Sequence, residues 1–262
     1  MSVETTLLLT VLGFGAGVLG AMAGIGGGIL IVPTLVIFFN VPLPQAIGTS
    51  LVAVIATSTA TSSVHLERHR TDARLGITLE LATTVGAAVA AMLAQHINRT
   101  ILALLFVGFL AYSVVALVRR VWSSRAQPQQ DEPPAYQVRG YPAGLAVSLV
   151  AGAMSGLLGI GGGPILVPAM YLLMGVPLRV AAATSNFMIG ATAVSSAFIY
   201  YGHGNIRLDI SGPLLTGVLL GSFAGAHLAP RVRVRYIQLL LVVVMTYLAV
   251  QMLLRVVEGK VK

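Results

Sequence analysis

Two short glycine motifs are the residues of this chain whose types and spacing could do chemistry. The sequence GIGGG occupies residues 24–28 and recurs at residues 159–163. Consecutive glycines each cost a helix about 1 kcal/mol relative to alanine, so we expect each motif to interrupt a helix. A helix that begins after such a turn offers free N–H groups and the positive end of its dipole. The motifs therefore predict two anion-binding turns.

Prolines indicate a helix start after each glycine cluster. Pro164 directly follows the second cluster, where proline suits the first turn of a helix. Pro33 and Pro168 lie further in, and each removes a backbone hydrogen bond and clashes with the carbonyl four residues back. The competing interpretation is that the glycines only let helices pack closely. We adopt that interpretation for the scattered Gly13, Gly17, Gly20, Gly86 and Gly108.

Hydroxyl and amide side chains follow each motif at equivalent places in the two halves. They can donate hydrogen bonds to an oxyanion without a fixed charge, although helix capping or a bond to a nearby carbonyl is an equal alternative. The hydroxyls of residues 57–63, TSTATSS, are assigned instead to helix packing or a water-facing surface. The predicted substrate-binding residues are Gly24, Gly26, Gly27, Gly28, Pro33, Thr49, Ser50, Gly159, Gly161, Gly162, Gly163, Pro168, Thr184, Ser185 and Asn186.

The composition predicts a membrane protein. Of the 262 residues, 56% are hydrophobic and 9% are charged, whereas soluble domains carry about 25% charged residues. Lipid must therefore cover much of the surface, and we expect a multi-pass protein of the cell (inner or plasma) membrane. The net charge of +8 sits in short clusters between apolar runs. The positive-inside rule explains such clusters without a nucleic-acid partner.

The two halves align with a constant offset of 135 residues. Residues 24–33 and 159–168 share seven identities in ten, and Pro42, Gly86 and Tyr112 also meet their own kind in the second half. The sequence therefore predicts a repeat at 1–122, a polar, proline-rich linker at 123–140 and a second repeat at 141–262. Apolar runs lie at about 6–23, 29–39, 44–64, 76–95 and 100–118, and at about 143–158, 164–175, 179–200, 208–229 and 236–254.

The predicted fold is an all-α polytopic bundle of two homologous repeats. Each repeat has a broken or re-entrant helix pair around its glycine motif and three spanning helices. If the first two runs form a hairpin, each repeat crosses the membrane an odd number of times and the repeats are inverted. If they form one broken span, the repeats are parallel. We expect inverted repeats.

Three ionisable residues are candidates for coupling transport to protons. Glu80 is the acid inside an apolar run, which makes it a functional hypothesis by default. However, it lies near one end of the run, and Leu215 takes its place in the other half. This favours an acid that reaches for the interface. His65 and His203 lie near polar connections and could titrate near neutral pH, although exposed loop residues are the more common case.

Several other classes of function do not fit the sequence. GAGVLG at residues 15–20 matches the dinucleotide fingerprint, but no acid follows until Glu67 and the second copy loses the pattern. No cysteine is present, and the membrane runs lack clustered His, Asp or Glu of the kind an enzyme needs. We therefore expect no enzyme activity, no cofactor and no metal. No nucleotide-binding loop appears, so energy would come from a gradient.

The paired motifs, with a TS pair after each and a linker between the halves, resemble those of the TauE/SafE family of sulfite and organosulfonate exporters. The resemblance covers essentially the whole chain. It implies a secondary transporter, in the first place an exporter, of small sulfur-containing anions such as sulfite or sulfoacetate, driven by an ion gradient that we expect to be protons. The alternatives are an importer of another small anion (sulfate, thiosulfate or a carboxylate) and an anion channel. The expected partners are the small anionic substrate, the lipid bilayer and a second copy of the chain.

Overall fold

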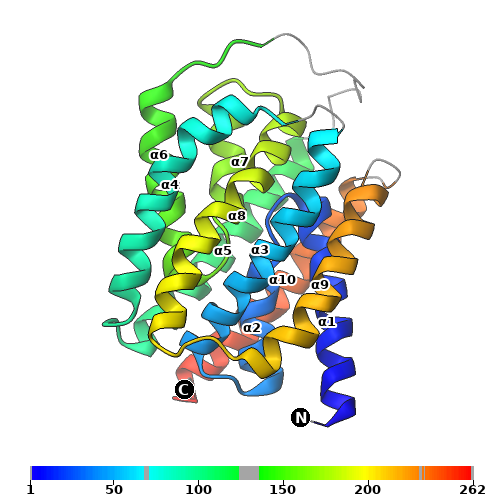
Figure 1. Cartoon of the computed structure of the whole chain (residues 1–262), viewed down its shortest axis with the longest axis vertical. Coiled ribbons are helices and arrows are strands. Elements are labelled where there is room, and N and C mark those ends of the chain that lie inside the picture. The colour runs from blue at the N-terminus through cyan, green and yellow to red at the C-terminus, as the bar shows by residue number, and fades with distance from the viewer. Residues whose placement is uncertain (1, 68–70, 124–135, 230–231, 233, 261–262) are drawn as a thin grey trace.

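The chain is a bundle of α-helices. The computed structural model describes residues 2–67, 71–123, 136–229, 232 and 234–260, and this part of the chain contains ten helices and no strand (Figure 1). The predicted all-helical class is confirmed. The first half contributes α1 (Val3–Ala23), α2 (Gly28–Phe39), α3 (Leu43–Glu67), α4 (Ala73–Ala94) and α5 (Arg99–Ser123). The second half contributes α6 (Tyr141–Leu158), α7 (Gly163–Leu172), α8 (Leu178–Gly202), α9 (Leu208–Leu228) and α10 (Val234–Val257).

Eight of the described helices are long and apolar enough to cross a membrane, and α2 and α7 are shorter. The outer surface carries many large apolar side chains, among them Leu81 and Phe198, each 73% exposed. A soluble protein rarely exposes apolar patches of this extent, so lipid is the solvent of this surface. The protein is a multi-pass membrane protein, as the composition predicts.

Helices α1 and α9 run parallel and touch through glycine. A Cβ atom placed on Gly217 would lie 2.0 Å from the carbonyl oxygen of Thr10, and one placed on Gly225 would lie 2.7 Å from that of Val18. Residue numbers rise together along both helices, which gives them a common direction. Because real Cβ atoms do not approach other atoms so closely, alanine would force the two backbones apart.

Helices α4 and α6 pack in the same manner. A Cβ atom on Gly152 would lie 2.0 Å from the carbonyl oxygen of Thr83, and one on Gly156 would lie 2.2 Å from that of Ala87. The packing interpretation of the scattered glycines holds for Gly13, Gly17, Gly20 and Gly86, each of which lies against a neighbouring backbone. For Gly108 it finds no support within the described chain, where no atom of another helix lies within 4 Å of a Cβ placed there.

Each glycine motif turns the chain back on itself. Helix α3 runs parallel to α9, since Gly48 lies against Asn205 while Ala60 shares a surface groove with Leu220. Helix α1 has this direction too, and α2 runs against it to reach the start of α3. Helices α1 and α2 therefore form a hairpin, with the N-terminus and α2 in the lower part of the view (Figure 1).

The second hairpin enters the bundle from the opposite end. Helix α6 begins at the top of the view, and α7 lies in the upper half (Figure 1). Helices at equivalent positions in the two halves, such as α1 and α6, thus run in opposite directions. This is the arrangement that inverted repeats require. The duplication and the domain boundaries stay predictions from the sequence, and most of the expected linker lies outside the described residues.

An arginine of α10 holds the outer end of α2. The guanidinium of Arg255 donates to the carbonyl oxygens of Val36 at 2.8 Å and Ile37 at 2.6 Å, and to Asn40 Oδ1 at 2.9 Å. The last carbonyls of a helix have no partner within it, and a short helix in lipid has no water to supply one. Arg255 therefore fixes α2, and with it the first glycine turn.

The end of the linker is tied to the start of α4. The hydroxyl of Tyr136 donates to Asp72 Oδ2 at 2.8 Å, and Asp72 Oδ1 caps α4 by accepting from the backbone of Leu75. Burial and the bond to Asp72 raise the pKa of Tyr136 well above its usual range. The phenol therefore stays a hydrogen-bond donor at physiological pH.

We predict that Gly152→Ala destabilises the protein, because the new methyl group meets the backbone of α4. Overpacking of this kind costs about 1–3 kcal/mol. The measurement is thermal unfolding of the detergent-purified protein. Gly108→Ala is the matched control, since it lies inside α5 with open space beside it, and it should leave the melting temperature unchanged or raise it. Equal melting temperatures for the two variants would contradict the packing.

We also predict that Arg255→Ala lowers the melting temperature, because two partly buried carbonyls lose a charged donor. Hydrogen bonds to charged groups contribute about 1.5–3 kcal/mol. Lys260→Ala is the control, since Lys260 forms an exposed pair with Glu258, and such pairs contribute about 0–1 kcal/mol. Arg255→Lys should rescue only part of the loss, because an ammonium group lacks the planar fork of donors. An unaltered melting temperature for Arg255→Ala would refute the role of this contact.

Candidate anion site

The two glycine turns adopt the same unusual backbone conformation. In the first turn, φ is 73° at Gly24, 80° at Gly26 and 72° at Gly27. In the second, the corresponding values are 68°, 83° and 76° at Gly159, Gly161 and Gly162. Residues other than glycine rarely adopt positive φ, so the motif is required by the turn itself. Gly27 and Gly162 are the N-caps of α2 and α7.

The two turns touch each other in the interior of the bundle. A Cβ atom on Gly28 would lie 2.5 Å from the carbonyl oxygen of Gly159, and one on Gly163 would lie 2.8 Å from that of Gly24. All four glycines are buried. The N-termini of the two half-helices therefore meet, each against the turn of the other half. Helix α7 begins at Gly163, one residue before the predicted start at Pro164.

A serine hydroxyl bonds the two turns together. Ser50 Oγ on α3 lies 2.9 Å from the carbonyl oxygen of Gly159 and 3.4 Å from that of Gly28. Its oxygen would also lie 3.0 Å from a Cβ atom on Gly28. Ser50, from the first half of the chain, thus donates to the turn of the second half.

Uncharged side chains surround the turns. Ile189 on α8 lies against Gly26, Gly161 and Gly163, and its equivalent Val54 on α3 lies against Gly28 and Gly161. The hydroxyl of Thr57 would lie 3.6 Å from a Cβ atom on Gly27. The donors at this place are therefore backbone amides and hydroxyls.

Backbone N–H groups in both turns lack acceptors. Within the described part of the chain, the N–H groups of Gly26, Gly27, Gly161 and Gly162 make no hydrogen bond. Buried N–H groups without a partner are rare. Successive N–H groups in a turn form a concave site that suits an anion, and the positive ends of α2 and α7 add to its potential. N–H groups of this kind are the donors that small oxyanions accept from in such turns.

Two polar side chains of α8 are also buried without partners. Ser185 is fully buried and its Oγ has no hydrogen-bond partner among the described residues, and the same holds for Oδ1 of Asn186, which is 1% exposed. Ser185 is the equivalent of Ser50, 135 residues on. Its hydroxyl is thus the one of the pair that remains available to donate.

The two predicted threonines, Thr49 on α3 and Thr184 on α8, contact the starts of other helices. Thr49 Oγ1 accepts from the backbone N–H of Arg207 at 3.3 Å, and Thr184 Oγ1 accepts from that of Asp72 at 3.0 Å. Asp72 and Arg207 are the N-caps of α4 and α9. The structure therefore uses Thr49 and Thr184 to hold these helix starts, which agrees with the capping alternative.

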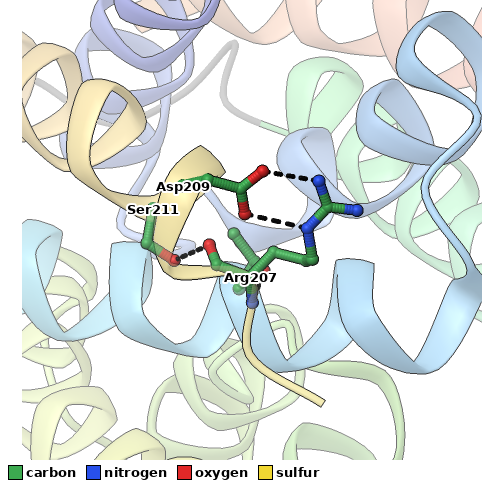
Figure 2. Close-up of polar contacts among 4 residues, drawn as sticks. Arg207, Asp209 and Ser211 are labelled. Carbon is green, nitrogen blue, oxygen red and sulfur yellow. Dashed lines mark hydrogen bonds and ion pairs between the residues drawn. The ribbon is translucent and has the colours of Figure 1, made fainter. Parts of the chain in front are cut away.

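The start of α9 carries an ion pair. Arg207 Nε donates to Asp209 Oδ1 at 2.8 Å, and the hydroxyl of Ser211 donates to the carbonyl oxygen of Arg207 at 2.8 Å (Figure 2). Both charged side chains are nearly half exposed. Because Asp209 offsets its charge, Arg207 contributes little net positive potential at this end of the bundle.

The prolines lie inside the half-helices, beyond the turns. Pro33 is in α2 and Pro168 is in α7. Proline has no N–H, so the carbonyl oxygens of Ile29 and Pro164 lose their usual helical partners. Their place in the helices is as predicted, and they shape α2 and α7 instead of lining the turns.

Glu80, the acid inside an apolar run, points towards the neighbouring helix α8. Glu80 Oε1 accepts from the hydroxyls of Thr84 at 2.9 Å and of Thr192 on α8 at 2.8 Å. Glu80 Oε2 is buried and has no partner among the described residues. The carboxyl group therefore lies between α4 and α8. The expectation that it reaches for the interface is wrong.

The histidines lie away from the turns. His203 is exposed at the C-terminal cap of α8, with Nδ1 at 2.8 Å from the carbonyl oxygen of Ile199. His65 belongs to the end of α3, and its side chain lies outside the described residues.

Four residues near the site were missed from the sequence. Val54, Thr57 and Ile189 touch the glycine turns, and Thr192 binds Glu80. The constant offset could have found them, because Val54 and Ile189 are equivalent positions, as are Thr57 and Thr192.

Comparison with known proteins gives one family. Residues 9–252 match the family model described as Sulfite exporter TauE/SafE. The probable membrane transporter protein YunE of Bacillus subtilis is 28% identical over 94% of this chain and 97% of its own. A probable membrane transporter protein of Xylella fastidiosa is 32% identical, over 84% of this chain and 81% of its own.

A plant protein also matches in part. The Sulfite exporter TauE/SafE family protein 3 of Arabidopsis thaliana is 29% identical over 48% of this chain and 26% of its own. No solved structure matches. Because the family model covers nearly the whole chain, including both glycine turns, this protein belongs to the TauE/SafE family of membrane transporters.

Proposed function

We propose that this protein is a secondary transporter of small sulfur-containing anions, such as sulfite or sulfoacetate. The observation that carries the proposal is the meeting of two glycine turns in the buried centre, each with unpaired N–H groups at the start of a half-helix. Paired half-helices of this kind hold substrates in several transporters. Membership of a family named for sulfite export supports the choice of anion.

The neutral donors suit an anion that must also leave. An oxyanion of sulfur needs several hydrogen bonds, and backbone amides and the Ser185 hydroxyl can donate them. Hydrogen bonds from neutral donors to an oxyanion are charge-assisted, but they lack the full Coulomb attraction that a lysine or arginine would add. A site whose described neighbours include no lysine or arginine against the turns can therefore bind a desolvated anion and still release it.

The proposal is a carrier driven by an ion gradient, with the proton as the first candidate. Export is the direction that the family name supports, and uptake of sulfate, thiosulfate or a carboxylate is the alternative. A carrier is favoured over a channel because Val54 and Ile189 pack against the turns from both halves. We propose no enzyme activity, because acid–base or metal chemistry needs several acidic or histidine side chains close together. Among the acids whose side chains are described, Glu80 alone lies more than one turn inside a spanning helix.

Flux into proteoliposomes tests the proposal. Labelled sulfite and sulfoacetate should enter in a saturable manner, and unlabelled substrate inside should accelerate entry by exchange. Linear, unsaturable flux would identify a channel. No flux of any small sulfur anion would overturn the proposal.

We predict that Ser185→Ala weakens anion binding and leaves the fold intact. Its hydroxyl has no partner to lose, whereas a hydrogen bond to a charged ligand contributes about 1.5–3 kcal/mol, which is roughly a ten- to hundredfold rise in Kd. The measurement is the concentration dependence of sulfoacetate uptake, together with thermal unfolding.

Two serine variants control for a general effect. Ser113→Ala removes another buried hydroxyl without a partner in the described structure, on α5, which packs chiefly along α10. It should transport normally. Ser50→Ala should instead lower stability by about 1–3 kcal/mol, because it leaves the carbonyl of Gly159 unpaired. Normal affinity in Ser185→Ala would remove this residue from the site.

We further predict that Ile189→Val shifts substrate preference towards larger organosulfonates. This side chain lies against both turns, so removing one methyl group gives the anion more room. One methylene in an apolar pocket discriminates by about tenfold or more. The ratio of sulfoacetate to sulfite uptake measures the shift, and Ile199→Val, further along α8, is the control. An unchanged ratio would mean that Ile189 does not limit the size of the anion.

A further inference from the structure

We propose that Glu80 is a proton-binding site whose occupancy is linked to the anion at the glycine turns. The inference rests on the proposed function and adds to it the residue that carries the proton. It starts from the surroundings of a single carboxyl group between α4 and α8.

The carboxyl group has two unlike oxygens. Oε1 receives two hydroxyl hydrogen bonds, from Thr84 and Thr192, at 2.9 and 2.8 Å. Oε2 is buried and has no donor or cation beside it within the described structure. A buried carboxylate oxygen without a partner is costly, and a proton on that oxygen removes the cost. The two hydroxyls fix the orientation, so that the same oxygen is left for the proton.

Other ionisable groups lie on the helices around Glu80. Its own helix α4 packs against α6 and α8. Among the described residues, the carboxylate accepts hydrogen bonds from the hydroxyls of Thr84 and Thr192. The titratable and charged residues on these three helices are Arg74 on α4, Tyr141 on α6, and Arg179, Tyr200 and Tyr201 on α8.

One face of α8 joins Glu80 to the anion site. Ser185, Ile189 and Thr192 are spaced four and three residues apart, so they form one stripe along the helix. Ile189 touches both glycine turns, and Thr192 holds Glu80. A shift of α8 when an anion binds would therefore alter the surroundings of the carboxyl group. Protonation of the carboxyl group would in turn alter the anion site.

The charges set the sign of the linkage. No cationic side chain lies against the turns among their described neighbours. A negative Glu80 would therefore repel an anion bound there, and a neutral Glu80 would not. Anion binding therefore favours the protonated acid, and protonation favours the anion by the same factor. Proton and anion then travel in the same direction. An inward proton gradient would therefore drive the uptake alternative, and export would require an outward anion gradient large enough to exceed it.

The second half of the chain supplies a natural comparison. Leu215 takes the place of Glu80, although Thr57 corresponds to Thr192. Because only the first half has the acid at this position, the protein would have one proton site for its two glycine turns. Glu80→Leu thus places in the first half the residue that the second half already uses, and Glu80→Gln keeps the shape of the side chain.

Infrared spectroscopy and uptake test the inference separately. The purified protein should show a protonated-carboxyl band that appears as pH falls, grows when sulfoacetate is added, and is lost in Glu80→Gln and Glu80→Leu. Sulfoacetate is the probe at pH values above the range in which its own carboxyl group takes a proton, because there its sulfonate and its carboxylate both stay ionised and add no protonated-carboxyl band. In liposomes, both variants should lose acceleration by a proton gradient but retain exchange of sulfoacetate.

Glu258→Gln is the matched control, since Glu258 is an exposed acid beyond α10. It should keep both the band and the gradient dependence. Proton-driven uptake that persists in Glu80→Gln and Glu80→Leu, or a titrating band unaltered by them, would overturn the inference. A Glu80-dependent band that titrates in a protein that transports neither sulfite nor sulfoacetate would instead refute the proposed substrate class and leave the proton site in place.

Discussion

The fold depends on the close contact of two backbone turns where no side chain fits. Water is absent from the core of a membrane, so every backbone group there must find a partner in the protein or in what it binds. The turns at residues 24–28 and 159–163 lie against each other's carbonyl groups, with Ser50 as the hydroxyl between them. Glycine allows both the positive φ and the short distances. The hairpins, the half-helices and the helices around them are all arranged so that these two turns meet.

Because the turns meet, their chemistry is shared. Each half of the chain supplies one helix N-terminus and one set of N–H groups that make no hydrogen bond within the described structure, so in the proposed site both halves would donate to the anion. The helices that line the pair, α3 and α8, come one from each half, and each touches the turn of the other half through Ser50, Val54 or Ile189. A movement of either helix would alter both turns. Such a coupled movement is the physical basis that the proposed carrier would use to open its site to one side at a time.

Much of the architecture could be predicted from the sequence, and the site only in part. Apolar runs locate all ten helices within a few residues, since lipid demands long uninterrupted stretches. The glycine turns were found because several glycines together are costly in a helix. Thr49 and Thr184 contact the starts of α9 and α4, which lie far away in the sequence. The sequence alone therefore could not separate a capping role from a substrate-binding role for these two threonines. Glu80 was misjudged because its partner, Thr192, lies on another helix.

The packing of α1 on α9 has a consequence for the order of folding in the cell. Gly217 and Thr10 touch, although 207 residues separate them in the chain. At about 5–20 residues per second, the ribosome needs roughly 10–40 s to make the partner of α1. During this time α1 rests in the bilayer with its glycine face against lipid. Helix α1 is therefore synthesised well before the helix that packs against its glycine face.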